Sequence, residues 1–334
     1  MSADSWETAP ISPEEEVMSE AAAAAAASSS SEEVVEDTDS DQTTIASSSS
    51  SSAEKRQNLW FYAELNQVRL LQRALRPLFQ TAYTDREYPD DMFHAGHIRD
   101  AGHLSISPDG ILLICTTSFP PHLDAYLQLP LANFSAFRCR KERVLDLHLR
   151  LLENRINSTI DDYEDDDDGI SVCFSGAKPN YNALLYSLRD RDAVAVHSSE
   201  MALISSYRGS LGGLDWSDYS YIVSIEMPAQ IFRQLINSLS FYGFEVHADV
   251  TATRIMFRVV NKVVFLEEGA ERYRILRERG QYPFLLEFGI HHKSAFLNAA
   301  SLSDRVRLHQ LLDLRTVLEV PVNGLGSIMF CSRL

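Results

Sequence analysis

The sequence predicts an α+β protein of two tandem domains, each with helices packed on an antiparallel sheet, and three observations lead to this prediction. The chain has 334 residues, which is enough for two domains of ordinary size. Short apolar runs with alternating or β-branched residues predict strands, and Pro108-Asp109-Gly110 predicts the turn of a hairpin. One order of elements (strand, helix, strands, strand, helix, strands) occurs twice. Two helices packed against an antiparallel sheet, in each of two domains, place the protein in the α+β class.

The two copies can be followed along the chain. The first contains, in order, a strand at 59–65, a helix at 66–82, a hairpin at 103–117, a strand at 124–129, a helix at 130–140 and a strand at 143–152. The second contains a strand at 219–226, a helix at 227–243, strands at 243–250, 253–260, 262–268 and 283–290, a helix at 292–302, and strands at 305–312 and 316–322. The helix at 130–140 is predicted because proline suits the first helical position.

Acidic residues are concentrated in two segments, although the net charge of the whole chain is −17. Residues 1–57 hold 13 acidic and 2 basic residues, and the run DDYEDDDD at 161–168 holds 7 acidic residues. The remainder has 27 acidic and 28 basic residues, so acidity does not exclude a nucleic-acid partner. We expect a disordered acidic Ala/Ser-rich tail at 1–57, a first domain at 58–202 with an acidic insertion at 157–169, a linker at 203–218 and a second domain at 219–334.

Cysteine usage and hydropathy indicate the compartment. The four cysteines are isolated and form no CxxC pair, which suits a reducing environment and argues against a zinc knuckle. No apolar run approaches the roughly 20 residues that span a bilayer, so we expect no membrane association. The acidic N-terminus is unlike a signal peptide.

Three predicted helices have a polar side that is basic and poor in carboxylates. In the helix at 66–82, the arginines follow each other at i, i+4 and i+7 and therefore share one side. The helix at 227–243 has an arginine on its polar side and no carboxylate before its end. The basic residues of these helices, with one neutral neighbour, are Arg69, Arg73, Arg76, Arg138, Arg140, Lys141, Arg233 and Asn237. Cations at a helix end can also simply complement the helix dipole, so the matching positions carry the argument for one common surface.

No catalytic constellation emerges from the sequence. HAGH at 94–97 lacks further ligands for a metal, and the Gly-rich RGSLGGLD at 208–215 lacks the Lys-Ser/Thr of a phosphate loop. The acidic run at 161–168 lacks the ligand spacing of a calcium loop. We therefore expect a protein that is not an enzyme and has no cofactor and no metal.

The whole pattern resembles the sliding clamps of the proliferating cell nuclear antigen family, over roughly residues 59–334. The closest stretches are YSYIVSIEMPAQIFRQLINSLSFYGFEVHADVTATRIMFRV, DAYLQLPLANFSAFRCRKERVLDLHL and FLLEFGIHHKSAFLNAASLSDRVRLHQLL. The resemblance implies a ring around duplex DNA, with two clamp domains per subunit and helices lining the hole. The basic helical residues above would then contact phosphates without reading sequence. His291 would add a part of the lining that carries less positive charge than the arginine-bearing helices and whose charge depends on pH.

The resemblance also implies subunit and partner contacts. Family members join edge strands of two domains, and the matching residues here are Ile170, Val172, Phe174, Val260, Val263 and Phe265. They also dock short peptides beside the linker, for which the matching residues are His122, Leu211, Leu214 and Trp216. The divergent linker and the C-terminus SIMFCSRL depart from the family pattern, which puts the usual peptide specificity in question.

We therefore predict a DNA sliding clamp, a processivity factor for a DNA polymerase and other replication or repair proteins. The expected assembly is a homotrimer on double-stranded DNA, in the nucleus or at a viral replication site. Two alternatives remain open: a subunit of a heterotrimeric DNA-damage checkpoint clamp, and a scaffold with the clamp fold that binds only proteins.

Overall fold

A computed structural model describes ten stretches of the chain: residues 59–83, 101–117, 123–160, 169–177, 183–190, 192, 194–207, 221–267, 269 and 272–332. The predicted tail, most of the predicted linker, HAGH at 94–97 and the acidic run at 161–168 lie outside the described residues. Residues 50–334 form one compact unit, and the following description concerns that unit alone.

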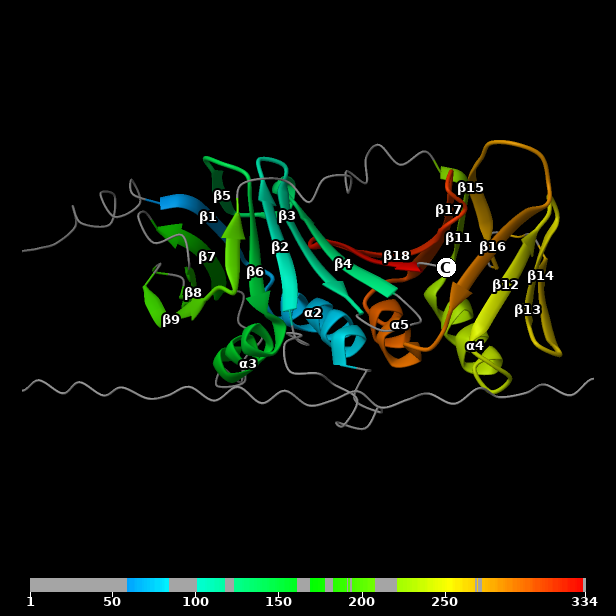
Figure 1. The fold of residues 1–334 in the computed structure, drawn as a ribbon, viewed down its shortest axis with the longest axis horizontal. Helices are drawn as coiled ribbons and strands as arrows, with labels where there is room; N and C mark the ends of the chain where they lie inside the picture. The colour runs from blue at the N-terminus through cyan, green and yellow to red at the C-terminus, as the bar shows by residue number, and fades with distance from the viewer. Residues whose placement is uncertain are drawn as a thin grey trace, which may run out of the picture. The chain divides into compact units, whose positions relative to one another are not determined.

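The unit contains four described α-helices and a series of short strands (Figure 1). The helices are α2 (Val68–Tyr83), α3 (Leu149–Ile160), α4 (Ala229–Leu239) and α5 (Lys293–Ala300). The first-half strands are β1 (Leu59–Leu65), β2 (Ala101–Ser107), β3 (Gly110–Thr116), β4 (Leu123–Pro130), β5 (Ala136–Cys139), β6 (Arg143–His148), β7 (Ser171–Ala177), β8 (Ala183–Arg189), β9 (Ala195–Ala202) and β10 (Ser205–Tyr207). The second-half strands are β11 (Tyr221–Pro228), β12 (Glu245–Val250), β13 (Arg254–Val259), β14 (Lys262–Glu267), β15 (Arg274–Glu278), β16 (Phe284–Gly289), β17 (Arg305–Leu311), β18 (Thr316–Val322) and β19 (Gly326–Ser332).

These strands form three antiparallel sheets, which confirms the predicted α+β class. Their orders are β5-β1-β7-β8-β9, β10-β6-β2-β3-β4-β19-β18-β17-β11-β15 and β14-β13-β12-β16. The ten-stranded sheet runs from one half of the chain into the other where β4 pairs with β19. At this junction Gly326 has a φ of 145°, and a Cβ there would lie 1.9 Å from the Gln128 carbonyl oxygen, so only glycine fits.

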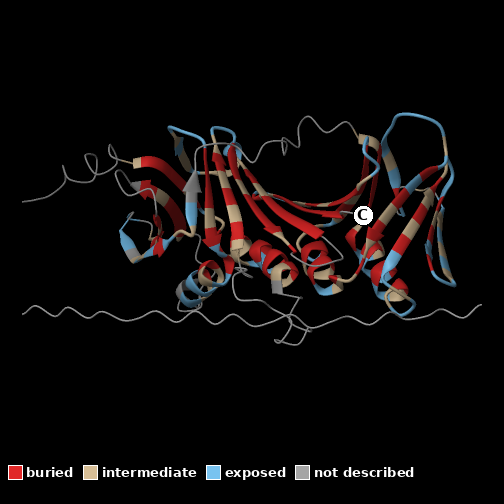
Figure 2. Cartoon of the chain, in the orientation of Figure 1, coloured by how far each residue is buried: buried red, intermediate tan, exposed pale blue. Residues whose placement is uncertain are grey.

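Apolar side chains of helices and sheets pack into one large core, and a smaller cluster that includes Ile114, Tyr126 and Met329 is separate from it. Leu71, Leu75 and Leu78 of α2 and Phe232 and Ile236 of α4 are buried in it, as their helical spacing predicts. Figure 2 shows buried residues along the sheets and on the helix sides that face them, whereas exposed residues lie on the outer sides of α3 and α4.

The helix predicted at 130–140 is wrong. Only Leu131–Asn133 form a single 3₁₀ turn, and residues 136–139 form β5, an edge strand that pairs with β1. Phe134 and Phe137 still pack against the core, but they do so from an extended segment. The proline that suggested a helix start is also the last residue of β4.

The first half instead has a helix that the sequence reading missed. The strand predicted at 143–152 ends at His148, and α3 begins at the next residue. Leu149, Leu152 and Ile156 are buried at helical spacing, which was the available signal. The predicted acidic insertion at 157–169 therefore begins inside a helix, because residues 149–160 are helical. Strands β8, β9, β10, β15 and β19 were also not predicted.

Candidate nucleic-acid interface

The four helices lie side by side in the order α3, α2, α5, α4 (Figure 1). Side-chain hydrogen bonds join neighbouring helices. Gln72 Nε2 of α2 donates to Asn157 Oδ1 of α3 at 3.1 Å, and Asn298 Nδ2 of α5 donates to Gln80 Oε1 of α2 at 2.7 Å. Lys293 Nζ of α5 donates to Ser240 Oγ, the C-cap residue of α4, at 2.9 Å. The helices therefore present one continuous outer surface.

Helix α2 supplies the first part of this surface. Its buried stripe holds Leu71, Leu75 and Leu78, which turns the intervening positions outward. Arg73 and Arg76 are exposed there, and Arg69 is half-buried one turn earlier. The helix contains no carboxylate. The three arginines stand on one helix, as expected, and their contact with DNA stays a prediction.

Helix α3 supplies two arginines that the sequence reading did not include. Arg150 and Arg155 are exposed, because the buried residues Leu149, Leu152 and Ile156 occupy the other side of the helix. Glu153, half-buried, is the acidic residue of α3. A helical reading of LRLLENRINSTI would have found both arginines.

Helix α4 supplies Arg233 and Asn237, both exposed and one turn apart, with no carboxylate on the helix. Together the four described helices contain seven basic residues and one acidic residue. We call the exposed arginines of this surface the arginine face: Arg73, Arg76, Arg150, Arg155 and Arg233. A surface of this composition favours a polyanion.

Arg138, Arg140 and Lys141 do not belong to the arginine face, which corrects their predicted placement on a helix. Arg138 lies on β5 and the other two follow that strand, all exposed. Arg138 is in register with Tyr62 on β1. The Tyr62 hydroxyl donates to Glu64 and accepts from Arg189. The three cations therefore lie on a sheet and the turn after it.

The histidines near α5 differ from the predicted pH-sensitive lining. His292 is only 5% exposed, and burial beside His291 lowers its pKa to about 4. His291 stacks on Phe244 with ring centroids 4.7 Å apart, and burial also lowers its pKa. Both rings are therefore neutral near pH 7 and add no positive charge there.

The predicted subunit contacts split into two groups. Strand β7 is not an edge, because β1 and β8 pair with its two sides, so Val172 and Phe174 are buried in the core and Ile170 packs against it. The prediction that these residues lie on an edge strand was wrong. Strand β14 is an edge of its sheet, and its Val263 and Phe265 are 39% and 53% exposed. Val260, in the preceding turn, is 72% exposed with a φ of 47°, a conformation that β-branched residues rarely adopt.

Exposed aromatic rings follow α4, and one of them, Tyr242, lies next to β14. Phe241, Tyr242 and Phe244 follow the end of α4 and are 83%, 51% and 54% exposed. The Lys262 Nζ atom of β14 lies 5.5 Å from the Tyr242 ring centroid, and Lys293 Nζ lies 5.4 Å from that of Phe241. A patch this rich in exposed aromatic residues is typical of a contact surface.

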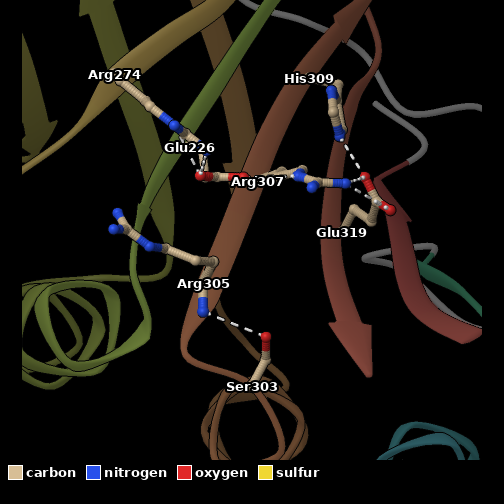
Figure 3. Close-up of polar contacts among 7 residues, drawn as sticks. All are labelled: Glu226, Arg274, Ser303, Arg305, Arg307, His309 and Glu319. Carbon is tan, nitrogen blue, oxygen red and sulfur yellow. Dashed lines mark hydrogen bonds and ion pairs between the residues drawn. The ribbon is translucent and has the colours of Figure 1, made fainter. Parts of the chain in front are cut away.

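A network of ion pairs lies on the sheet of the second half (Figure 3). Glu226 is buried, and its carboxylate forms ion pairs with Arg274 (Nη2 to Oε1, 2.6 Å) and Arg307 (Nε to Oε2, 3.0 Å). His309 Nε2 lies 2.9 Å from Glu319 Oε2. Burial alone would raise the pKa of Glu226, but hydrogen bonds from Arg307 and Arg274 hold this pKa below its usual value. The network therefore keeps both carboxylates ionised and ties β11, β15, β17 and β18 together.

Several predicted residues lie outside the described part of the chain, namely His122, Leu211, Leu214 and Trp216 of the peptide-docking prediction. Within the described residues, no group of three or more metal-ligating side chains comes together. No helix in the described stretches is long and apolar enough to cross a membrane.

Comparison with known proteins gives one informative match. No family model matches the chain. The proliferating cell nuclear antigen of Caenorhabditis elegans is 25% identical over 217 residues, which cover 61% of this chain and 76% of that protein. This match confirms the resemblance to the proliferating cell nuclear antigen family, and the α+β architecture with its large antiparallel sheets is consistent with the fold of that family.

Proposed function

We propose that this clamp-like chain is a DNA sliding clamp that encircles duplex DNA and tethers a DNA polymerase and other replication or repair proteins. One observation carries the proposal: three of the four adjacent described helices expose the arginine face, and the four together contain a single carboxylate. The proteins that this chain resembles are clamps, and the arginine face lies on the helices, where a clamp meets DNA.

The mechanism is mechanical, and no catalytic residue is needed. Guanidinium groups of Arg73, Arg150 and Arg233 would exchange phosphate partners along the duplex, because contacts to phosphates carry no sequence information. Neutral polar residues such as Gln230 and Asn237 would lie between these cations without repelling the backbone. A polymerase held by the clamp stays near the primer end at high effective concentration.

Assembly would use the free strand edges. Strand β14 is one such edge in the second half, and β9 is an edge of the five-stranded sheet in the first half. Pairing β14 of one copy with β9 of another would satisfy unpaired backbone groups and cover Val263 and Phe265. Repeated head to tail, this heterologous contact closes a ring if the rotation permits, and we propose a homotrimer acting in the nucleus.

The test reverses three arginines from three helices, as the variant Arg73→Glu/Arg150→Glu/Arg233→Glu. The matched control is Arg254→Glu/Arg258→Glu/Arg277→Glu, which reverses exposed arginines of β13 and β15. Duplex binding should weaken by at least about tenfold in the first variant, because a phosphate contact and its counterion release are lost at each site. The control should stay within about threefold.

Polymerase stimulation on a primed circular template provides the second readout. The proposal requires stimulation by the wild-type chain and its loss in the helix variant. A checkpoint clamp subunit would bind DNA only with other chains. A protein-only scaffold would keep its protein partners in both variants and show no arginine-dependent DNA binding.

A further inference from the structure

We propose that the open edge of strand β5 binds an extended peptide in which acidic and apolar side chains alternate. Among the described strands β1 alone pairs with β5, so about half of the backbone N–H and C=O groups of β5 point away from the sheet. Such an edge can receive an additional strand through main-chain hydrogen bonds. The inference goes beyond the proposed function, because it assigns a protein partner to a surface that is not part of the arginine face.

Strand β5 offers an edge of fixed geometry. Backbone hydrogen bonds hold it on β1 just before its first residue and just after its last one. Ser135 N donates to the Glu64 carbonyl oxygen at 2.9 Å, and Arg140 N donates to the Trp60 carbonyl oxygen at 3.0 Å. An incoming strand therefore has to order only its own chain, which lowers the entropic cost of binding.

The charge along this edge favours carboxylates. Arg138 on β5 and Arg140 and Lys141 directly after it are exposed, and Glu142 is the exposed carboxylate that accompanies these three cations. Charged side chains on an edge strand also discourage aggregation, but charges of either sign serve that purpose. An excess of cations adds an attraction for an acidic partner.

The two sides of β5 differ, and this difference sets the pattern of the partner. Phe137 and Cys139 are half-buried and pack against the core on one side of the strand, whereas Arg138 points to the other side. The Phe134 ring, also half-buried, lies 4.9 Å from the Phe137 ring between centroids. A strand laid along β5 would place alternate side chains beside these rings and beside Arg138. Apolar and acidic residues in alternation satisfy both sides.

The other described edges are poorer targets for such a peptide. Strand β15 is an edge next to β11, as β5 is an edge next to β1. Its Arg274 lies 2.6 Å from the buried Glu226, and Arg272 just before it lies 3.7 Å from Glu267. These cations already have carboxylate partners. The edges β9 and β14 would be covered in the proposed ring, whereas β5 would stay open.

The first experiment titrates a labelled synthetic peptide, GEVDLEVG, into the full-length chain at about 50 mM salt, where charge attraction is weakly screened. Wild type should bind it, and Arg138→Glu/Arg140→Glu should weaken binding at least about fivefold, because two attractions become repulsions. Arg138→Lys/Arg140→Lys keeps both charges and should stay within about threefold of wild type. The matched control Arg150→Glu/Arg155→Glu makes the same charge change on α3 and should stay within about twofold. No measurable binding by wild type, or equal loss in the two charge reversals, would overturn the proposal.

The second experiment separates strand pairing from simple charge attraction. GEVDLEVG methylated on alternate backbone nitrogens keeps its charge but loses donors for strand pairing, and the neutral peptide GQVNLQVG keeps the donors but loses the charge. Each should bind at least about fivefold more weakly than GEVDLEVG. Equal binding of the methylated and unmethylated peptides would sink the proposal, because the contact would then depend on charge alone.

Duplex binding by the same variants provides the last readout. Arg138→Glu/Arg140→Glu should bind duplex DNA within about threefold of wild type, since the β5 edge is not part of the arginine face. A loss as large as that of Arg73→Glu/Arg150→Glu/Arg233→Glu would assign the edge to nucleic acid and overturn the proposal. If the peptide binds β5 but no chain binds duplex, the proposed function fails while this inference stands.

Discussion

Asn298 of α5 donates a hydrogen bond to Gln80 of α2 at 2.7 Å, although 218 residues separate the two in the sequence. The bond joins a helix of the second half to a helix of the first half, on the surface that carries the arginine face. Both residues are half-buried, so their amides can still exchange with water. The relative position of the two helices therefore depends on this polar contact as well as on the apolar residues beneath it.

Breaking this contact should loosen the helix pair without unfolding the chain. Asn298→Ala and Gln80→Ala should each lower the free energy of unfolding by about 1 kcal/mol, the usual net value of one hydrogen bond. The double variant should cost less than the two single losses combined, because they share one interaction. Urea unfolding of the four chains of this cycle measures the coupling. Ser294→Ala, an exposed change on α5, is the control, and strictly additive losses would contradict the contact.

Glu226 should be among the most sensitive charged residues of the unit. Its carboxylate is 2% exposed and accepts from two guanidinium groups, so Glu226→Gln leaves Arg274 without this charge partner and leaves Arg307 with Glu319 alone. The variant loses charge-assisted hydrogen bonds worth about 1–3 kcal/mol in sum, because both arginines stay partly exposed to water. Glu267→Gln is the matched control, since Glu267 is 79% exposed and lies 3.7 Å from Arg272. Urea unfolding should show a large loss for the first variant and almost none for the second. Equal losses would refute the role assigned to Glu226.

The sequence predicted the second half better than the first, and the reason is physical. Helix α4 combines an apolar stripe with a proline before its first residue, so the apolar spacing and the proline both predict a helix that begins there. In PLANFSAFRCR the same proline signal and a similar apolar spacing occur in an edge strand, where pairing with β1 decides the conformation. Local propensity is a weak prior when tertiary contacts override it. Strand β7 was taken for an edge from the family resemblance, and its alternation could not correct this, because pairing partners far along the chain cannot be read from alternation alone.

The arginine face was predictable only in part for the same reason. Arg73, Arg76 and Arg233 stand on helices whose periodicity is clear, so their exposure follows from the buried stripe. Arg150 and Arg155 were not predicted as part of this surface, because the strand at 143–148 continues without a break into α3. Neither proline nor glycine marks that boundary, and only the change of apolar spacing after His148 reveals it.

Stability should fall as the pH drops below 6.5, because His292 is buried as a neutral ring. The unfolded chain takes up a proton on this histidine near its ordinary pKa of 6.5, whereas the folded chain does so only near 4. The unfolded state therefore gains up to about 3 kcal/mol relative to the folded state over this interval. Replacing the residue as His292→Gln removes the titrating group, so the slope of unfolding free energy between pH 6.5 and 5 should flatten. An unchanged slope in that interval would show that another group titrates there.

Below pH 4.5 a different set of groups should determine how the free energy of unfolding depends on pH. Glu226 and Glu319 have folded-state pKa values below the ordinary 4.5 because the hydrogen bonds they accept outweigh their burial. Their stabilisation is present above that value and is lost as the pH falls through the lower folded-state pKa. The variant Glu319→Gln should therefore weaken the pH dependence below the ordinary pKa of 4.5. Its dependence above pH 5 should stay that of wild type, and urea unfolding at both ends of the scale tests this.

The exposed edge of β14 should control self-association. Phe265→Lys and Val263→Lys place a charge on a strand edge, the change that natural sheets use to prevent edge pairing. We expect the dissociation constant of any oligomer to rise at least about tenfold, since a buried lysine costs more than 1.4 kcal/mol at an apolar contact. Leu312→Lys is the control, because Leu312 is 69% exposed in the turn between β17 and β18. Light scattering of the full-length chains across a concentration series should show a lower mass for the β14 variants alone. If all variants keep the wild-type mass, β14 is not an assembly edge, and if wild type itself is a monomer, closure of a ring needs another chain or DNA.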